Sequence, residues 1–150
     1  MAVNRAMERL RRVLELEEEL RRTEFEAAVA DLGRLEAALT ATEVRNREGR
    51  RLVTASAVMG EIADRLAGLE ETRSALLKSA AIKPRIAEAE LTVTNKREEF
   101  LAKRIERRQV QTVVERNEKR ELLEGARRTQ RGHDDWFLNR AGSPGGSDRR

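Results

Sequence analysis

Apolar side chains recur along the first third of the chain at alternating intervals of four and three residues. The clearest run comprises Ala28, Leu32, Leu35, Leu39 and Thr42, and a looser set precedes it at Met7, Leu10, Val13, Leu14 and Leu20. This interval places the side chains on one narrow stripe of a helix, as in the seam of a coiled coil. The pattern therefore predicts one long helix over about residues 4–52.

A second apolar stripe begins after residue 57. Its first part comprises Met59, Ile62, Leu66, Leu69 and Leu76, and the stripe resumes out of phase at Ile82, Ile86, Ala89, Val93 and Phe100. Such a change of phase is a stutter of the coiled-coil pattern. The pattern predicts a second helix over about residues 57–139, with these residues in its seam.

Two positions compete for the turn between the helices. Pro84 lacks a backbone N–H and clashes with the preceding helical turn. The segment 53–58 lies at the break between the stripes, contains β-branched residues and offers Ser56 as an N-cap. A turn at about 53–58 is favoured because it aligns apolar positions whose numbers add to about 110, namely Leu35 with Leu76, Leu32 with Ala80, and Leu10 with Phe100 or Leu101. The predicted fold is all-α, a long antiparallel two-helix coiled-coil hairpin.

On this alignment the second helix is longer than the first. Residues beyond about 107 have no partner in the chain and form an overhang on the order of 50 Å long at 1.5 Å per residue. The overhang carries exposed apolar side chains at Ile105, Val110, Val113, Val114, Leu122, Leu123, Trp136 and Phe137. A binding partner is therefore expected at this end. Residues 1–140 form the single predicted hairpin, and the Gly, Ser and Pro content of 141–150 predicts a disordered tail.

Composition agrees with long helices and narrows the classes of function. Ala, Glu, Lys, Leu and Arg supply 90 of the 150 residues, and there is no Cys. No apolar run is long enough for a membrane span or a signal peptide, so a cytoplasmic location is expected. The 31 basic and 27 acidic residues are interspersed, which favours protein partners over nucleic acid.

Candidate catalytic chemistry is sparse. His133 is the one histidine, and the chain has no Cys, so the further His or Cys ligands that a zinc site needs are absent. The glycines are dispersed and form no phosphate-binding loop. These features predict a protein that is not an enzyme and has no metal or cofactor. Trp136 and Phe137 are adjacent and point about 100° apart on a helix, so one seam cannot bury both and an anchoring role is predicted.

Three segments resemble one protein family. They are LRRVLELEEE at 10–19, TASA at 54–57 followed by LAGLE at 66–70, and RRTQRGHDDW at 127–136. Together they resemble the FliJ proteins of bacterial flagellar export and their relatives, the central stalks of type III secretion. Two departures are Arg65, where the family has Phe, and the segment QVQTVV at 109–114.

The resemblance implies a hairpin similar to the coiled coil of the gamma subunit of a rotary ATPase. The end with both termini would enter the pore of a hexameric export ATPase through Arg127, Arg128, Arg131, Asp134 and Trp136. The region near the turn would bind the cytoplasmic domain of the membrane export gate through Arg50, Arg51, Met59 and Arg65.

Export chaperones are further expected partners, and the protein would associate peripherally with the membrane apparatus without inserting into the membrane. Flagellar and injectisome systems both fit. The alternative is a generic coiled-coil scaffold or a chaperone-like interaction protein.

Overall fold

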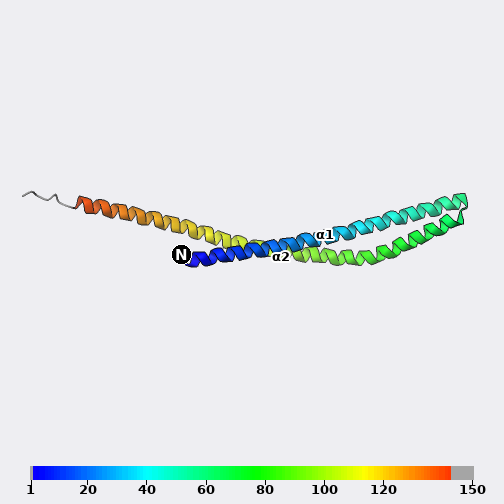
Figure 1. The fold of residues 1–150 in the computed structure, drawn as a ribbon, viewed down its shortest axis with the longest axis horizontal. Coiled ribbons are helices and arrows are strands. Elements are labelled where there is room, and N and C mark those ends of the chain that lie inside the picture. The colour runs from blue at the N-terminus through cyan, green and yellow to red at the C-terminus, as the bar shows by residue number, and fades with distance from the viewer. Residues whose placement is uncertain (1, 143–150) are drawn as a thin grey trace, which may run out of the picture. The chain divides into compact units, whose positions relative to one another are not determined.

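The chain forms two long helices that pack against each other. The computed structural model describes residues 2–142, with side chains from Asn4 onward. Helix α1 spans Ala2–Met59 and helix α2 spans Ile62–Ala141 (Figure 1). The described residues contain no strand, which confirms the predicted all-α class. Contacts divide the chain into a central unit, Leu16–Ile105, and a terminal unit, residues 1–15 with 106–150.

Helix α1 ends at a glycine cap. Gly60 has a φ of +75°, and its N–H donates to the carbonyl of Ser56 at 2.7 Å. This is the left-handed cap that glycine adopts without strain. The predicted turn at 53–58 is therefore wrong, because the helix continues through that segment and breaks only at Gly60 and Glu61.

Ser56 does not cap the second helix. It is buried inside α1, and its hydroxyl donates to the carbonyl of Val53 at 2.8 Å. Helix α2 instead begins after Glu61, whose carboxyl shares a hydrogen bond with Asp64 in the first turn. This hydrogen bond and the negative charge of Asp64 raise the pKa of Glu61. The predicted helix bounds of 4–52 and 57–139 are corrected accordingly.

Helix α2 passes through Pro84 without a break. Proline removes one intrahelical hydrogen bond but does not end the helix here. The alternative turn at Pro84 is thus also excluded. The helix ends at Ala141, and residues 143–150, most of the predicted disordered tail, lie outside the described residues.

The seam of the central unit follows one unbroken heptad phase on each helix. The positions of α1 that are buried or half-buried in this phase are 18, 21, 25, 28, 32, 35, 39, 42, 46, 49, 53 and 56. Those of α2 are 68, 72, 75, 79, 82, 86, 89, 93, 96, 100 and 103. The predicted run from Ala28 to Thr42 is confirmed as seam, whereas the predicted stutter in α2 is wrong.

Contacts between the helices of the central unit set a register that differs from the predicted one. As residue numbers rise in α1 they fall in α2, and the paired numbers add to about 120: Glu17 with Lys103, Arg21 with Glu99, Glu24 with Lys96, Phe25 with Phe100, and Arg45 with Glu71. Leu35 accordingly lies beside Arg85 and Glu88 and not beside Leu76. Phe100 stacks on Phe25, with ring centroids 6.2 Å apart, and not on Leu10.

The seam of the terminal unit continues further along α2 than predicted. Its covered positions are Asn4, Met7, Arg11 and Leu14 on α1, and Arg107, Val110, Val114 and Asn117 on α2. Val114 is only 1% exposed, and the side-chain amide of Asn4 donates to Glu121 at 3.2 Å. The expectation that α2 lacks a partner beyond about residue 107 is therefore wrong. The residues of α2 become fully exposed only after Asn117.

Candidate interaction surfaces

The last part of α2 in the terminal unit, residues 118–141, forms a fully exposed helical segment, here called the C-terminal segment. Trp136 is half-exposed, and the neighbouring Phe137 and Leu138 are more exposed still. The rings of Trp136 and Phe137 meet edge to face at 5.1 Å, and the guanidinium of Arg140 lies 4.9 Å from the Trp136 ring. Edge-to-face and cation–π contacts of this kind hold large aromatic side chains in place at a surface.

The predicted basic residues of this segment gather on one part of its surface. Arg127, Arg128 and Arg131 line a shallow depression with Glu124. Four- and three-residue spacings also place Asp134 on the face of Arg131 and Arg127. Trp136 lies nine residues after Arg127, which is about 180° around the helix. The structure thus brings the three arginines together and places Trp136 opposite Arg127 and about 80° around the helix from Arg128.

A second depression in the same segment was not predicted from the sequence. It has a volume of about 560 Å³ and is lined by Glu118, Glu121, Leu122, Gly125 and Ala126. Gly125 and Ala126 carry little or no side chain, so the helix surface is hollow beside Leu122. The signal in the sequence was this pair of small residues next to two consecutive leucines.

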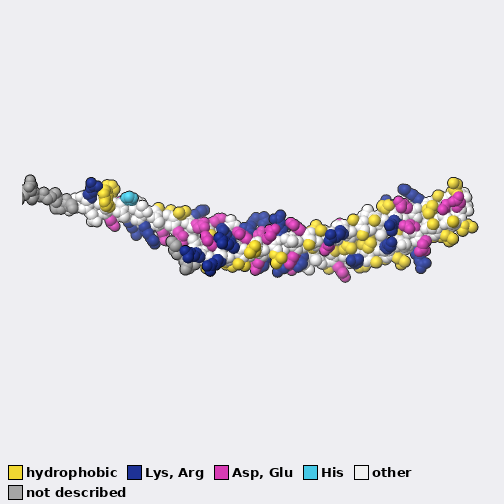
Figure 2. Space-filling view, in the orientation of Figure 1, with side chains coloured by type: hydrophobic (Ala, Val, Ile, Leu, Met, Phe, Trp, Pro, Cys, Tyr) yellow, Lys and Arg dark blue, Asp and Glu magenta, His cyan; other side chains and the backbone are white. Residues whose placement is uncertain are grey.

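The start of α2 in the central unit presents an exposed apolar stripe, here called the leucine face: Ile62, Leu66, Leu69 and Leu76. Each of its members is more than half exposed. Figure 2 shows hydrophobic side chains gathered over this end of the central unit. The prediction that these residues lie in the seam is wrong. The seam beside them contains small residues instead, at Gly68, Thr72, Ala75 and Ser79.

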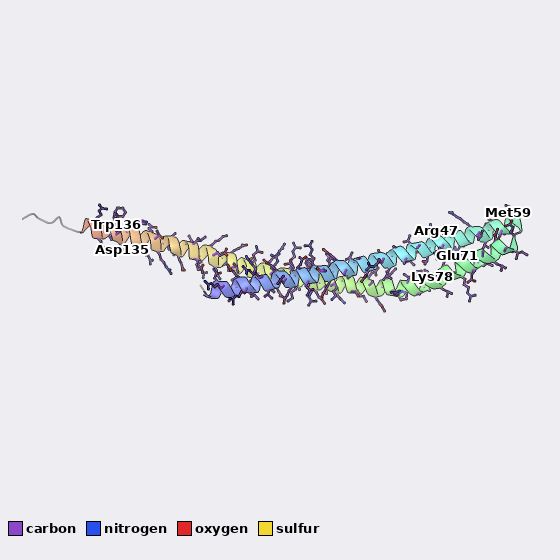
Figure 3. All side chains as sticks on the ribbon, in the orientation of Figure 1. Arg47, Met59, Glu71, Lys78, Asp135 and Trp136 are labelled. Atoms are coloured by element: carbon purple, nitrogen blue, oxygen red, sulfur yellow. The ribbon has the colours of Figure 1, made fainter. Side chains whose placement is uncertain are left out.

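The residues predicted to bind the export gate are all exposed at the same end of the central unit. Met59 is 77% exposed and is the last residue of α1 (Figure 3). Arg50 and Arg51 lie two turns earlier on α1, and Arg65 lies next to Leu66 on α2. These three arginines make no ion pair within the described part of the chain. The arrangement suits a partner that presents apolar side chains flanked by carboxylates.

Six charged residues form a ladder across the seam of the central unit. Glu24 accepts hydrogen bonds from Arg21 at 3.0 Å and from Lys96 at 3.4 Å, and Lys96 also donates to Glu99. Lys103 and Glu17 form a further ion pair at 3.0 Å. The hydrogen bond from Arg21 and the charge of Lys96 lower the pKa of Glu24. The hydrogen bonds to Glu24 and Glu99 raise the pKa of Lys96. The ladder joins the two helices.

Residues 2–142 offer neither a metal-binding cluster nor a membrane-spanning helix. No group of three or more His, Cys, Asp or Glu residues there is placed to hold a metal ion. Neither α1 nor α2 has, in its described residues, an apolar stretch sufficient to span a membrane.

Comparisons with known proteins identify no related protein. No protein-family model, no curated protein and no solved structure matches this chain.

Proposed function

We propose that this chain is a non-enzymatic stalk of a flagellar or type III protein export apparatus. In this proposal the two helices form an antiparallel coiled-coil hairpin whose second helix overhangs the first. The C-terminal segment inserts into the ring of a hexameric export ATPase. The end near Gly60 binds the cytoplasmic domain of the membrane export gate, so that the chain links the two.

The observation that carries the proposal is the C-terminal segment. It is a helix of which every residue from 118 to 141 is exposed, yet it holds Trp136, Phe137 and Leu138. Such side chains are typical anchors of protein interfaces. Because Arg127 and Trp136 lie on opposite faces, a partner that uses both must surround the helix. A ring with a central pore meets that requirement.

The charges of the C-terminal segment suit contacts that form and break during the catalytic cycle of the hexameric ATPase. Arg127, Arg128 and Arg131 lie among the acidic residues Glu124 and Asp134, and all are exposed. Exposed ion pairs are worth only ~0–1 kcal/mol each, so they form and break readily. Such residues orient the helix in the pore, whereas Trp136 supplies the apolar contact.

The proposal for the export gate depends on the end of the central unit near Gly60. The side chains of Arg50, Arg51 and Arg65 form no ion pair with the described residues, and Met59 is largely exposed. An acidic, partly apolar segment of the gate would pair with them. Replacement of Arg65 by Glu should then weaken gate binding while ATPase stimulation stays unchanged.

The decisive experiment measures ATP turnover by the export ATPase of the same organism with and without this chain. Stimulation is expected from the full chain and not from a version that ends at Glu121, which keeps the whole seam. The double variant Trp136→Ala with Phe137→Ala should lose most of the stimulation. Thr129→Ala, an exposed change in the same segment, is the matched control. Absence of stimulation and of co-elution with the ring would reject the proposal.

A further inference from the structure

Helix α2 carries a second coiled-coil stripe that α1 does not cover. The leucine face extends through Arg73 to Ala80, so its positions 62, 66, 69, 73, 76 and 80 alternate by four and three. The stripe that packs on α1 uses 68, 72, 75 and 79. The two stripes lie on different sides of one helix. A heptad stripe of leucines is the surface that another helix packs against in a coiled coil.

A charged residue interrupts the leucine face at its centre. Arg73 occupies a seam-like position between Leu69 and Leu76, and it forms no ion pair or side-chain hydrogen bond with the described residues. Glu70, one turn earlier, is likewise unpaired within the described part of the chain. A partner helix that covers the leucine face must therefore offer an acid to Arg73 and a base to Glu70.

We propose that a second copy of this chain covers the leucine face. The two α2 helices pack antiparallel across a two-fold axis near residue 71, so that facing positions add to 142. Ile62 then faces Ala80 of the other copy, Leu66 faces Leu76, and Leu69 faces Arg73. In antiparallel coiled coils each a position faces a d position, and this alignment pairs every a with a d along residues 62–80.

The same alignment satisfies the unpaired charges. Arg73 lies opposite Leu69 of the other copy, and its guanidinium reaches the adjacent Glu70 of that copy. The two-fold axis repeats this ion pair, so the interface is complementary to itself, as a two-fold interface requires. Arg65 faces Leu77 of the other copy. An unrelated partner would have to supply the same leucines, acid and base in the same order.

The size of the surface predicts a weak dimer. Each copy contributes four large apolar side chains, and each of these is at least half exposed in the single chain. The surface area that they can bury is at the lower end of the range for specific interfaces. Association should therefore depend on protein concentration. It does not depend on any export component, so it is tested apart from the proposed function.

Sedimentation equilibrium of the full chain over a wide concentration range tests the proposal. The mass should rise from that of one chain to that of two. Leu69→Glu should keep the protein a monomer, whereas Leu91→Glu, at a leucine 66% exposed outside this face, should leave association unchanged. Circular dichroism checks that both variants remain helical. A monomer at every concentration, or a dimer that Leu69→Glu leaves intact, would overturn the proposal.

A charge exchange tests the ion pair. Arg73→Glu and Glu70→Arg should each raise the dissociation constant of the dimer by about tenfold or more. A tenfold change corresponds to ~1.4 kcal/mol of binding free energy. The double variant with both changes should recover it. If the double variant is as weak as the single ones, the pairing of Arg73 with Glu70 is rejected.

The direction of packing is tested with single cysteines, since the chain has none of its own. A short thiol cross-linker should join Ile62→Cys to Ala80→Cys in a mixture of the two variants. Efficient linking of Ile62→Cys to itself would mean parallel helices and would overturn the antiparallel arrangement.

Discussion

Two glycines bring the backbones of α1 and α2 into direct contact in the central unit. A Cβ atom added to Gly68 would lie 2.7 Å from the carbonyl oxygen of Gly49, and one added to Gly49 would lie 2.9 Å from that of Gly68. Distances this short are not compatible with a side chain. Both positions therefore need glycine for the close approach and not for backbone flexibility, since each lies inside a helix.

Gly68→Ala should lower the free energy of unfolding. Alanine favours a helix by about 1 kcal/mol over glycine, but overpacking against backbone atoms costs about 1–3 kcal/mol. Gly33→Ala is the matched control, because nothing lies within 4 Å of its added Cβ, and it should stabilise the protein. Thermal unfolding followed by circular dichroism measures both. A gain in stability from Gly68→Ala equal to that from Gly33→Ala would contradict the close contact.

Asn46 is a polar residue in the seam of the central unit. Its Oδ1 atom is buried and accepts no hydrogen bond from the described residues. Asn46→Leu should therefore raise the free energy of unfolding by about 1 kcal/mol, because it removes an unsatisfied buried group. Chemical denaturation measures the change, and the exposed Asn95→Leu should give a value near zero. An unchanged or lower stability for Asn46→Leu would show that the amide is satisfied in solution.

At the scale of the helices, the ion-pair ladder makes their association depend on pH. The folded-state pKa of Glu24 is lowered, so its stabilising effect is complete above the unfolded value of about 4.5 and is lost as pH falls through the folded value. The pKa of Lys96 is raised, so its effect is complete below about 10.5 and is lost as pH rises through its folded value. Stability should be level between these limits.

Glu24→Gln should lower the melting temperature at pH 7, and the difference from the parent should shrink as the pH falls below about 4.5 and through the folded-state pKa of Glu24. At pH 7 the variant loses the carboxylate that binds Arg21 and Lys96, whereas protonation removes the same charge from the parent at low pH. Melting curves recorded from pH 7 downward measure the difference. Glu36→Gln, at an exposed carboxylate, is the control and should change little over this range. A difference between Glu24→Gln and the parent that does not shrink as the pH falls would exclude the charge as its cause.

The seam was predictable where it uses the larger apolar residues. Leu32 and Leu35 of α1 and Ile82 and Ile86 of α2 lie in the seam as predicted. Leu10, Val13 and Leu20 are predicted on the stripe of α1 but are exposed. The start of α2 was not predictable, because its seam near Gly60 uses Gly68, Thr72 and Ala75 while the leucines face outward. A prediction that assigns the largest apolar residues to the seam then chooses the wrong face and adds a stutter to restore the phase.

The sequence predicted that a turn separates the two helices, but it did not predict the position of that turn. Gly60 is the residue expected just after a helix end, but the β-branched residues of 53–58 favoured an earlier break. That error shifted the predicted register by about ten residues. Among the candidate site residues, the exposure of Trp136 followed from the sequence, whereas Met59, which the pattern places in the seam, is exposed. The depression beside Leu122 did not, because it depends on small side chains.

At the scale of the whole molecule, the exposed C-terminal segment should not contribute to folding stability. A chain that ends at Glu121 keeps the contact of Asn4 and the buried Val114, so its melting temperature should equal that of the full chain. Its helical signal should fall in proportion to the residues removed. Val114→Ala is the contrasting variant and should destabilise the chain by about 1–3 kcal/mol. A large drop in melting temperature on truncation would show that the segment packs on the rest of the chain.

The contact between Gly49 and Gly68 also makes the alignment of the two helices unambiguous. A seam with an unbroken seven-residue repeat can slip by whole repeats and keep each helix facing the other. A slip of one repeat would place Gly49 against Ala75 or Glu61, and Gly68 against Thr42 or Ser56. Each of these residues brings a Cβ atom to a place that has room for none. The pair of glycines thus selects one alignment, because the other alignments related by whole repeats would place a Cβ atom in this close contact.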